Sequence, residues 1–321
     1  KFGGFLGENM NPIIISKQQL KSLFKIASTE DIVDFVNNNN NIIYPKPKYN
    51  GEIRFIHSPS DHLKTIQRWI VDNILSQKLV SDVAHAYCPE KSIFTNAKIH
   101  IGSNIVLKMD INSFFDSIPI EEVKGIFLSL GYNLEVSHSL AEFCTNKGFV
   151  RQGFSSSPII SNIILKEFDD ELEKILSQSS YSRYGFRYSR YADDITISSV
   201  HKVVDEMKTI EQSIVELLGK NGFLVNNNKT KLIIGSGPKK ITGIVVKESS
   251  VSVPNRYKKK LLQELYYCKK FGVTSHLIYT GNYGRMNYIA HLKGIATFIK
   301  NTDAEFYDKM IDEILTLDIE S

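Results

Sequence analysis

Two adjacent aspartates in the sequence Tyr191-Ala192-Asp193-Asp194 have the residue types and spacing that could do chemistry. They lie between two segments of β type, SRYGFRYSRY before them and ITISSV after them. Adjacent carboxylates in a tight turn repel each other, so each resists ionisation. A divalent cation removes this penalty. The pair therefore indicates part of a metal site, although a solvated turn would explain the two acids taken alone.

A third carboxylate, Asp110, ends the apolar run 104–110 (NIVLKMD), which has the composition of a buried strand. Mg²⁺ prefers oxygen ligands in octahedral geometry and keeps positions open for substrate phosphates. Two such ions about 4 Å apart activate an attacking oxygen and stabilise a leaving one. One acid at a strand end and two in a hairpin turn form the arrangement that polynucleotide polymerases use.

The residues after Asp110 read INSFFDSI, which places Phe115 five positions beyond the aspartate. There the ring would meet the sugar of an incoming nucleotide and would clash with a 2′-hydroxyl. Phe114 and Phe115 are equally compatible with packing in the core, and we expect one of them to be buried.

Two more segments carry residues suited to a nucleotide. The segment 152–162 (QGFSSSPIISN) contains Gly153, which permits close approach of the backbone to a ligand. Ser157 and Pro158 are expected as the N-cap and first residue of a helix. The segment 222–229 (GFLVNNNK) ends in Lys229, whose ammonium could reach a pyrophosphate leaving group, although a solvated lysine explains it equally well.

In this order and spacing the segments resemble the palm of reverse transcriptases, over roughly residues 50 to 250. The resemblance implies two catalytic Mg²⁺ ions held by Asp110, Asp193, Asp194 and the carbonyl of Ile111. It also implies deoxynucleoside triphosphate substrates, a steric gate at Phe115, and a nucleotide pocket lined by Gln152, Gly153 and Lys229.

Two short motifs resemble those of the retron reverse transcriptases in particular. Residues 96–100 (NAKIH) match an NAxxH element, and residues 241–243 (ITG) stand where that family has VTG. A packed histidine and an ordinary strand would explain either motif alone. The resemblance makes the following residues candidates for RNA binding: Asn96, His100, Thr242 and Gly243.

The retron resemblance also implies a biological setting. The template would be a dedicated structured noncoding RNA, and synthesis would start from the 2′-hydroxyl of a guanosine. The product would be a branched RNA–DNA hybrid, called msDNA. Because retrons are bacterial antiphage systems, a separate effector protein is an expected partner.

The charge of the 321-residue chain is modest overall, at +4, but strongly uneven. Residues 251–300 hold nine Lys or Arg and a single acid, Glu264, together with six tyrosines. Such a segment suits contact with phosphates and stacking on unpaired bases. A solvated helix face over a tyrosine-lined core is the alternative. The candidate RNA-binding residues here are Arg256, Lys258, Lys259 and Lys260.

The pattern predicts an α+β right-hand polymerase fold with fingers, a palm of antiparallel sheet plus helices, and a small helical thumb. We expect an N-terminal helical region at 1–47, fingers and palm at 48–250, and the thumb at 251–321. A fingers hairpin at 48–56 would turn at Asn50-Gly51 and carry Arg54 toward the triphosphate. Helices are predicted at 12–36, 61–80 with Asp61 as the candidate cap, 119–130, 135–146, 158–178 and 203–220, and palm strands at 223–226, 230–234 and 240–246. The asparagine run 37–41, with Pro45 and Pro47 after it, is expected as a loop, and the thumb is expected to be mostly helical from Asn255.

Several other classes are disfavoured. Cys88, Cys144 and Cys268 are far apart, which argues against a zinc site or a disulfide framework. No apolar run approaches membrane-spanning length, and the first residues lack a signal-peptide layout, so a cytoplasmic setting without membrane contact is expected. Two alternatives stay open: another bacterial reverse transcriptase, of group II intron or diversity-generating type, and a noncatalytic RNA-binding scaffold that kept the polymerase fold.

Overall fold

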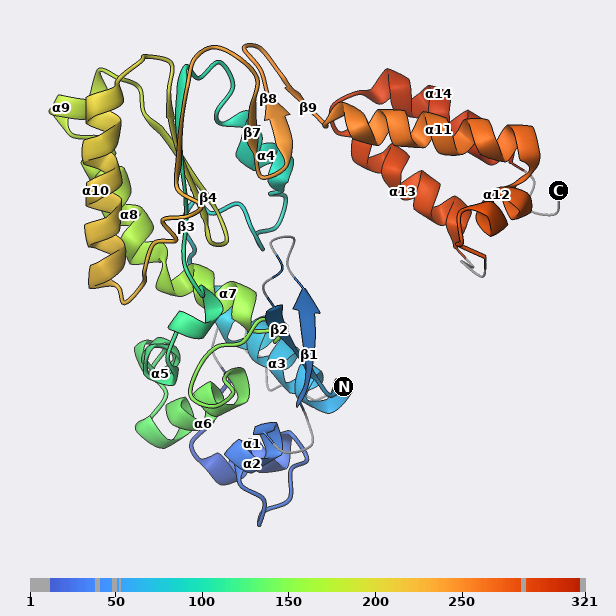
Figure 1. Ribbon diagram of the computed structural model, residues 1–321. Coiled ribbons are helices and arrows are strands. Elements are labelled where there is room, and N and C mark those ends of the chain that lie inside the picture. The colour runs from blue at the N-terminus through green and yellow to red at the C-terminus, as the bar shows by residue number, and fades with distance from the viewer. Residues whose placement is uncertain (1–11, 38–40, 48–50, 52, 284–286, 318–321) are drawn as a thin grey trace.

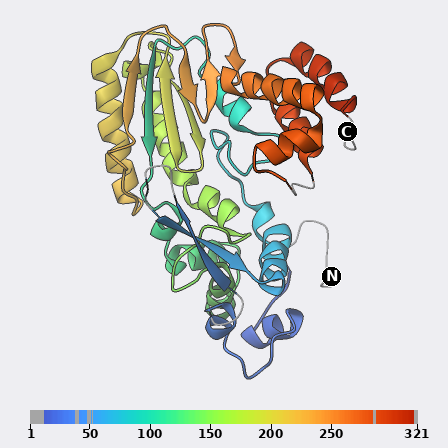
Figure 2. The same cartoon turned by 45° about the vertical axis from the view of Figure 1, so that its right-hand side comes forward.

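The computed structural model describes residues 12–37, 41–47, 51, 53–283 and 287–317. Its elements form a mixed α+β structure with separate antiparallel sheets, as the sequence predicts. In Figures 1 and 2 the N-terminal helices and a hairpin lie below a central sheet, and the C-terminal helices form a separate group beside it.

The N-terminal part and the fingers comprise short helices and one hairpin. The elements are α1 (Lys17–Leu23), α2 (Ile32–Asn37), β1 (Asn41–Pro47), β2 (Ile53–Pro59), α3 (Asp61–Asn73) and the 3₁₀ turn η1 (Leu75–Gln77). The N-cap of α3 is Ser60, whose hydroxyl accepts from the Leu63 N–H, so the expectation of a cap at Asp61 was wrong.

The predicted fingers hairpin is present, but it is longer than expected. Strand β1 includes Pro45 and Pro47, which the sequence had suggested were part of a loop. Proline is tolerated because β1 pairs only with β2, so its other edge needs no backbone donor. The expected boundary at residue 47 therefore falls inside the hairpin, and β1 belongs with the fingers. Of the predicted turn, Gly51 has a φ of 85°, and Asn50 lies outside the described residues.

The palm is a four-stranded antiparallel sheet in the order β4-β5-β3-β6. Figures 1 and 2 show α8 and α10 against one side of it and α4 on the other. The elements are β3 (Ile105–Asp110), β4 (Arg187–Tyr191), β5 (Asp194–Ser199), β6 (Lys231–Ile234), α4 (Ile93–Lys98), α8 (Lys166–Leu176) and α10 (Val204–Lys220).

Three predicted palm elements differ from expectation. The predicted strand 240–246 is a hairpin of two short strands, Lys239–Ile241 and Ile244–Val246, in a separate three-stranded sheet. The predicted helix 158–178 is divided into α7 (Ser157–Ile164) and α8 at Leu165, where ψ is 0°. Its N-cap is Ser156, and Ser157 instead donates its hydroxyl to the Arg151 carbonyl. Residues 223–226 do not form a strand but make only a single bridge, between Val225 and Ile111.

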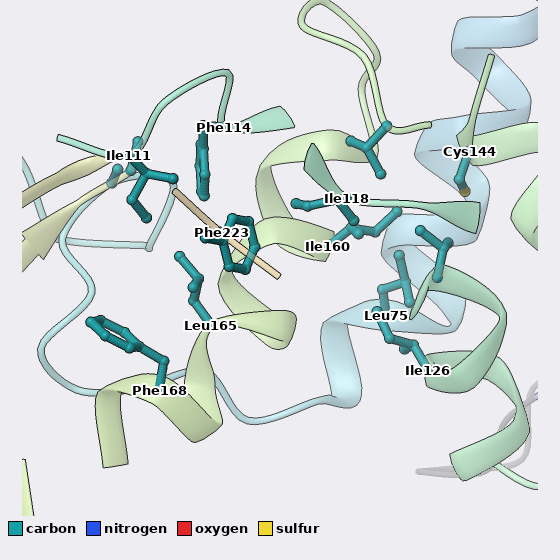
Figure 3. Close-up of a cluster of buried hydrophobic side chains, with 14 of the residues drawn as sticks. Leu75, Ile111, Phe114, Ile118, Ile126, Cys144, Ile160, Leu165, Phe168 and Phe223 are labelled. Carbon is teal, nitrogen blue, oxygen red and sulfur yellow. The ribbon is translucent and has the colours of Figure 1, made fainter. Parts of the chain in front are cut away.

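Below the end of β3 the chain packs into the larger of two apolar clusters among the described residues. Figure 3 shows Phe114, Phe223 and Leu165 in this core, together with Ile111, and the rings of Phe114 and Phe223 are 6.1 Å apart. This packing anchors the chain on both sides of Asp110. The elements around this core also include η2 (Phe115–Ser117), α5 (Ile120–Ser129), α6 (Leu134–Cys144) and α9 (Ser179–Ser182).

The second apolar cluster joins a small sheet, the predicted thumb and α4, whose Phe94 and Ala97 are buried in it. Its elements are β7 (Lys239–Ile241), β8 (Ile244–Val246), β9 (Val251–Ser252), α11 (Asn255–Phe271), α12 (Val273–Tyr279), α13 (Tyr288–Lys300) and α14 (Ala304–Leu315). From Asn255 onward the described elements are all helices, as expected for the thumb, whose bounds stay a prediction. Among the helices that the structure describes, none has both the length and the apolar character needed to cross a membrane.

Candidate active site

Three carboxylates meet at one end of the palm sheet. Asp110 is the last residue of β3 and pairs directly with Asp194, the first residue of β5. Asp193 lies in the turn before β5, and its carbonyl accepts from the Ile111 N–H at 3.0 Å. Segments far apart in the chain are thus brought together by the antiparallel register, at the place where the sequence predicts a metal site.

The turn that carries the two adjacent acids is tight. Tyr191 pairs with Asp194, so only Ala192 and Asp193 form the loop. Ala192 has a φ of 56°, in the left-handed region that residues other than glycine seldom adopt. A conformation of this kind persists only where surrounding contacts enforce it.

Asp110 is 6% exposed and held from several directions. Its two carboxylate oxygens each lie 2.8 Å from the Nζ of Lys229, and Oδ1 also accepts from the Asn226 side chain at 3.3 Å. The Asn226 backbone N–H donates to the Asp110 carbonyl at 2.8 Å. The segment 222–229 thus brings its lysine to the carboxylate cluster.

The charges of the site perturb one another. Burial, together with the neighbouring charges of Asp110 and Asp194, raises the pKa of Asp193 to about 6. Burial also raises the pKa of Asp194, against the opposing effect of Lys108. Partial burial would lower the pKa of Lys229, but its hydrogen bond and charge interaction with Asp110 outweigh this and raise it. The site therefore carries more negative charge than one lysine offsets.

The donor set fits a hard divalent cation, because all three groups are carboxylates, and burial together with their mutual repulsion raises the pKa of Asp193. Within the described part of the chain, however, no three His, Cys, Asp or Glu side chains are already gathered around one point. Lys229 supplies the positive charge at Asp110 in this conformation. Gathering the carboxylates around an ion requires this ammonium to move.

The two aromatic residues that follow Asp110 differ in how deeply they are buried. Phe114 is buried in the core, whereas Phe115 is half-buried at the start of η2.

Sequence reasoning missed Arg151, whose guanidinium donates to Asp116 at 2.7 Å and to the Asn146 carbonyl at 2.9 Å. This ion pair links the chain beside Phe115 to the segment that holds Gln152 and Gly153.

Gly153 has a structural reason to be glycine. Its φ is 110°, and a Cβ built on it would lie 1.9 Å from the carbonyl oxygen of His57. The His57 N–H in turn donates to the Gln152 carbonyl at 2.9 Å. The backbone that approaches Gly153 so closely is thus strand β2 of the fingers. A role of Gln152 and Gly153 in lining a nucleotide pocket stays a prediction.

Arg54 is exposed on β2, directly opposite Lys46 of β1. Like charges facing each other across two strands destabilise the pair. An anion near this hairpin would relieve that repulsion, which is consistent with the predicted contact to a triphosphate.

The NAxxH motif is internal to the protein. His100 is fully buried, and its two ring nitrogens lie 2.7 Å from the Ser198 hydroxyl and 2.8 Å from the Ser189 hydroxyl. Burial lowers its pKa to about 3, so the ring is neutral. Asn96 is 1% exposed, and its side-chain amide donates to the Thr242 hydroxyl at 3.3 Å.

These contacts give the motifs a packing role, which is the alternative that the sequence had left open for His100. His100 joins β4 to β5, and Asn96 joins α4 to the turn between β7 and β8. In that turn, Thr242 is half-buried and Gly243 is exposed. Both line a groove of about 520 Å³ whose other wall includes Lys108 and Asp194. Direct RNA contact by these four motif residues stays a prediction.

The predicted thumb carries a larger groove of about 1350 Å³ along α11 and α12. Its lining includes the basic residues Arg256, Lys259 and Lys260 and the aromatic residues Tyr257, Tyr267 and Tyr279. Lys258 differs from its neighbours because it forms an ion pair with Asp303 of the thumb itself. The sequence had grouped these four cations together, and the structure separates Lys258 from the other three.

Comparison with known proteins agrees with this arrangement. Residues 44–254 match the family described as reverse transcriptase (RNA-dependent DNA polymerase). The retron Ec86 reverse transcriptase of Escherichia coli is 30% identical over 83% of this chain and 77% of its own length. The retron Mx65 reverse transcriptase of Myxococcus xanthus is 27% identical over 84% of this chain, which spans 63% of that relative.

A solved structure supports the fold. An apo telomerase from Candida tropicalis superimposes with a TM-score of 0.50 and 16% identity, over 90% of this chain and 61% of that one. The predicted polymerase fold is therefore confirmed. On the family match and the extent of its similarity to curated relatives, the chain belongs to the retron reverse transcriptases and is an RNA-directed DNA polymerase.

Proposed function

We propose that this polymerase copies a dedicated structured noncoding RNA, starting from the 2′-hydroxyl of a guanosine in that RNA, and yields the branched RNA–DNA hybrid called msDNA. The proposal extends to a role in antiphage defence with a separate effector protein. It is supported by the similarity to curated retron reverse transcriptases over more than four fifths of the chain.

The observation that carries the catalytic part is the direct pairing of Asp110 with Asp194, with Asp193 in the adjoining turn. These three carboxylates would hold two Mg²⁺ ions, with the Ile111 carbonyl as a further ligand. When bound, such ions lower the pKa of the primer hydroxyl and neutralise charge on the departing pyrophosphate.

The chain's own groups do the positioning. Lys229 would leave Asp110 when the ions are bound by the carboxylates, and its ammonium stays charged because a lysine is protonated at neutral pH. It then contacts the pyrophosphate oxygens. Phe115 blocks a 2′-hydroxyl on the incoming nucleotide, Gln152 and Gly153 border its pocket, and Arg54 contacts its phosphates.

Nucleic acid follows two positively charged grooves in this proposal. The primer end lies in the groove that runs from Asp194 to Thr242 and Gly243, where Lys108, Lys231 and Lys240 contact its phosphates. The structured RNA occupies the thumb groove, where Arg256, Lys259 and Lys260 neutralise phosphates and tyrosine rings stack on unpaired bases.

The test is to purify the chain from its native host, extract the bound nucleic acid and analyse it for a 2′,5′-branched RNA–DNA species. We expect one that disappears in the variants Asp193→Asn and Asp194→Asn. If no branch is found but added primer and template are extended, the chain is another class of reverse transcriptase. If neither is seen, a noncatalytic scaffold with this fold replaces the proposal.

A further inference from the structure

Arg190 is the largest side chain that is fully buried in the described structure. It lies on β4, one residue before the Tyr191-Ala192-Asp193-Asp194 turn. Its Nε and Nη2 donate to the carboxylate of Asp169 on α8, at distances of 2.7 to 3.2 Å. Asp169 is also fully buried and accepts from the Tyr188 hydroxyl at 2.5 Å.

Burying an ion pair in a protein core carries a large desolvation cost. Removing two charges from water costs several kcal/mol per ion, and apolar residues of similar volume often stabilise a fold equally well. Stability alone therefore does not explain the pair. The contacts of the remaining guanidinium nitrogen, Nη1, indicate a further role for Arg190.

Nη1 of Arg190 donates to the backbone carbonyl of Ala192 at 3.2 Å. Ala192 is the residue with a left-handed backbone, and its carbonyl belongs to the peptide group that leads into Asp193. On the other side, the Asp193 carbonyl is held by the Ile111 N–H. The two peptide groups that flank Asp193 are thus fixed from both sides.

The guanidinium is itself immobilised by a third partner. Nη1 also donates to Oδ1 of Asn162 at 3.1 Å, and the Asn162 amide donates to the Ala86 carbonyl at 2.9 Å. The Arg190 backbone bonds to the same segment, through Val83 and His85. The network therefore joins α7, α8, the segment 83–86 and the turn.

We propose that Arg190 is a positioning residue for Asp193 and Asp194, acting through the Ala192 carbonyl, with Asp169 and Asn162 holding its guanidinium in place. The inference rests on the proposed function, in which these aspartates hold the catalytic ions. It assigns a task in the polymerase reaction to a residue that never touches the substrate.

The first test compares Arg190→Lys and the paired change Asp169→Leu/Arg190→Met with the unaltered chain. Lysine keeps the charge beside Asp169 but lacks the planar fork that reaches both partners. The paired change removes both charges and retains apolar volume. Melting temperature, RNA affinity, kcat, KM for the nucleotide and the Mg²⁺ concentration for half-maximal rate are measured for each.

We expect kcat to fall about 10²-fold in both, because a misplacement of about 1 Å has that effect. The half-saturating Mg²⁺ concentration should rise several-fold, while RNA affinity and nucleotide KM stay within twofold. Tyr188→Phe is the matched control, because it removes another hydrogen bond of Asp169 without touching the Ala192 contact. It should leave kcat and the Mg²⁺ requirement unchanged.

The proposal is overturned if either variant is folded and keeps its kcat and Mg²⁺ requirement within twofold of the original. It is also overturned if Tyr188→Phe has the same effect as the arginine variants, since the network would then act through stability alone. Should the paired variant fail to fold, Arg190→Lys decides the matter. Asp193→Asn distinguishes failure of the proposed function from failure of this inference. If Asp193→Asn is active, the assignment of the catalytic site fails. If Asp193→Asn is inactive but Arg190→Lys has normal activity, only this inference is overturned.

Discussion

Asp193 binds a proton more tightly than an ordinary aspartate because burial and two neighbouring carboxylates disfavour its ionised form. The folded protein therefore stores an unfavourable charge interaction at neutral pH. A cation bound at the proposed metal site would relieve that interaction.

We predict that Asp193→Asn abolishes DNA synthesis and, without divalent ions, makes the protein more stable above pH 6. The folded pKa is raised to about 6, so ionisation of Asp193 destabilises the folded state as pH rises from about 4 through 6. The gain on substitution should be on the order of 1–3 kcal/mol at pH 8 and vanish near pH 4.

Thermal unfolding at pH 4 and pH 8, with and without Mg²⁺, measures this effect. Mg²⁺ should raise the melting temperature of the original chain but not that of the variant, and RNA affinity should be unchanged. Asp308→Asn, at an exposed position on α14, serves as the control. Equal melting temperatures of original and Asp193→Asn at pH 8 without Mg²⁺ would contradict the charge argument.

Gly153→Ala is predicted to destabilise the protein strongly, because the new methyl group would meet the His57 carbonyl. Overpacking costs about 1–3 kcal/mol, and a left-handed backbone adds about 1–2 kcal/mol for a residue with a Cβ. Gly131→Ala provides the control. Its φ is 92°, but no atom lies within 4 Å of the added Cβ. Urea unfolding should show the larger loss at Gly153, and equal losses would refute the close approach.

For single residues, the sequence predicted those positions that depend on local patterns. Asp110 ends a strand and the paired acids occupy a hairpin turn, so the antiparallel pairing between β3 and β5 brings them together. It did not predict contacts between distant segments. The bond from Lys229 to Asp110 is one of these, and the burial of His100 between two serines is another. The one local signal for Arg190 was a charged residue in a strand that is otherwise buried.

Elements were predicted best where one face is apolar over several turns, as in α5, α6 and α10. Errors arose where tertiary contacts override local preference. Residues 223–226 were predicted as a strand. Their backbone instead makes isolated contacts with the chain at Asp110 and Ile111, namely one hydrogen bond from the Asn226 N–H to the Asp110 carbonyl and one bridge between Val225 and Ile111. Pro45 and Pro47 suggested a loop, but an edge position in a two-stranded sheet accepts them.

The docking of α4 on the palm sheet predicts a specific pH dependence. His100 is neutral in the folded state with a pKa of about 3, whereas the unfolded chain takes up a proton near pH 6.5. The free energy of unfolding should therefore fall by about 2 kcal/mol between pH 7 and pH 5 on account of this residue. His100→Gln keeps a polar side chain and should remove that part of the decrease.

Urea unfolding of both proteins at pH 5 and pH 7 tests this expectation. His201→Gln changes an exposed histidine and should leave the pH dependence as it is. The same decrease in His100→Gln as in the original chain would mean that the ring is not the group responsible.

At the scale of the whole molecule, the described residues divide between two apolar cores, one under the fingers and palm and one under the thumb. The proposed catalytic carboxylates adjoin the first core, and the basic aromatic groove adjoins the second. Catalysis and recognition of the RNA should therefore respond separately to substitution, although the sheet and α4 connect them.

Charge reversal at Lys259 and Lys260 should weaken RNA binding and lower its salt dependence, by a slope of about 1 for each phosphate that is no longer neutralised. Lys208→Glu/Lys220→Glu, on exposed positions of α10, removes the same charge from a distant helix and should have little effect. RNA affinity measured over a range of salt concentrations distinguishes the two. Lys258→Glu should chiefly lower stability, because it replaces the partner of Asp303. Equal weakening by both lysine pairs would show that only net charge matters.

Helix α4 is synthesised before most of the residues that cover its apolar side chains. Phe94 and Ala97 pack against β7, β8 and the thumb helices, which lie some 150 to 200 positions later in the chain. During synthesis these side chains remain uncovered until residues 239–315 have emerged from the ribosome. Pairing over such a distance slows folding and leaves apolar surface open to wrong contacts. The ribosome-bound intermediate should consequently depend on chaperones at this helix, and polymerase activity should appear only after residues 239–315 have emerged and folded over it.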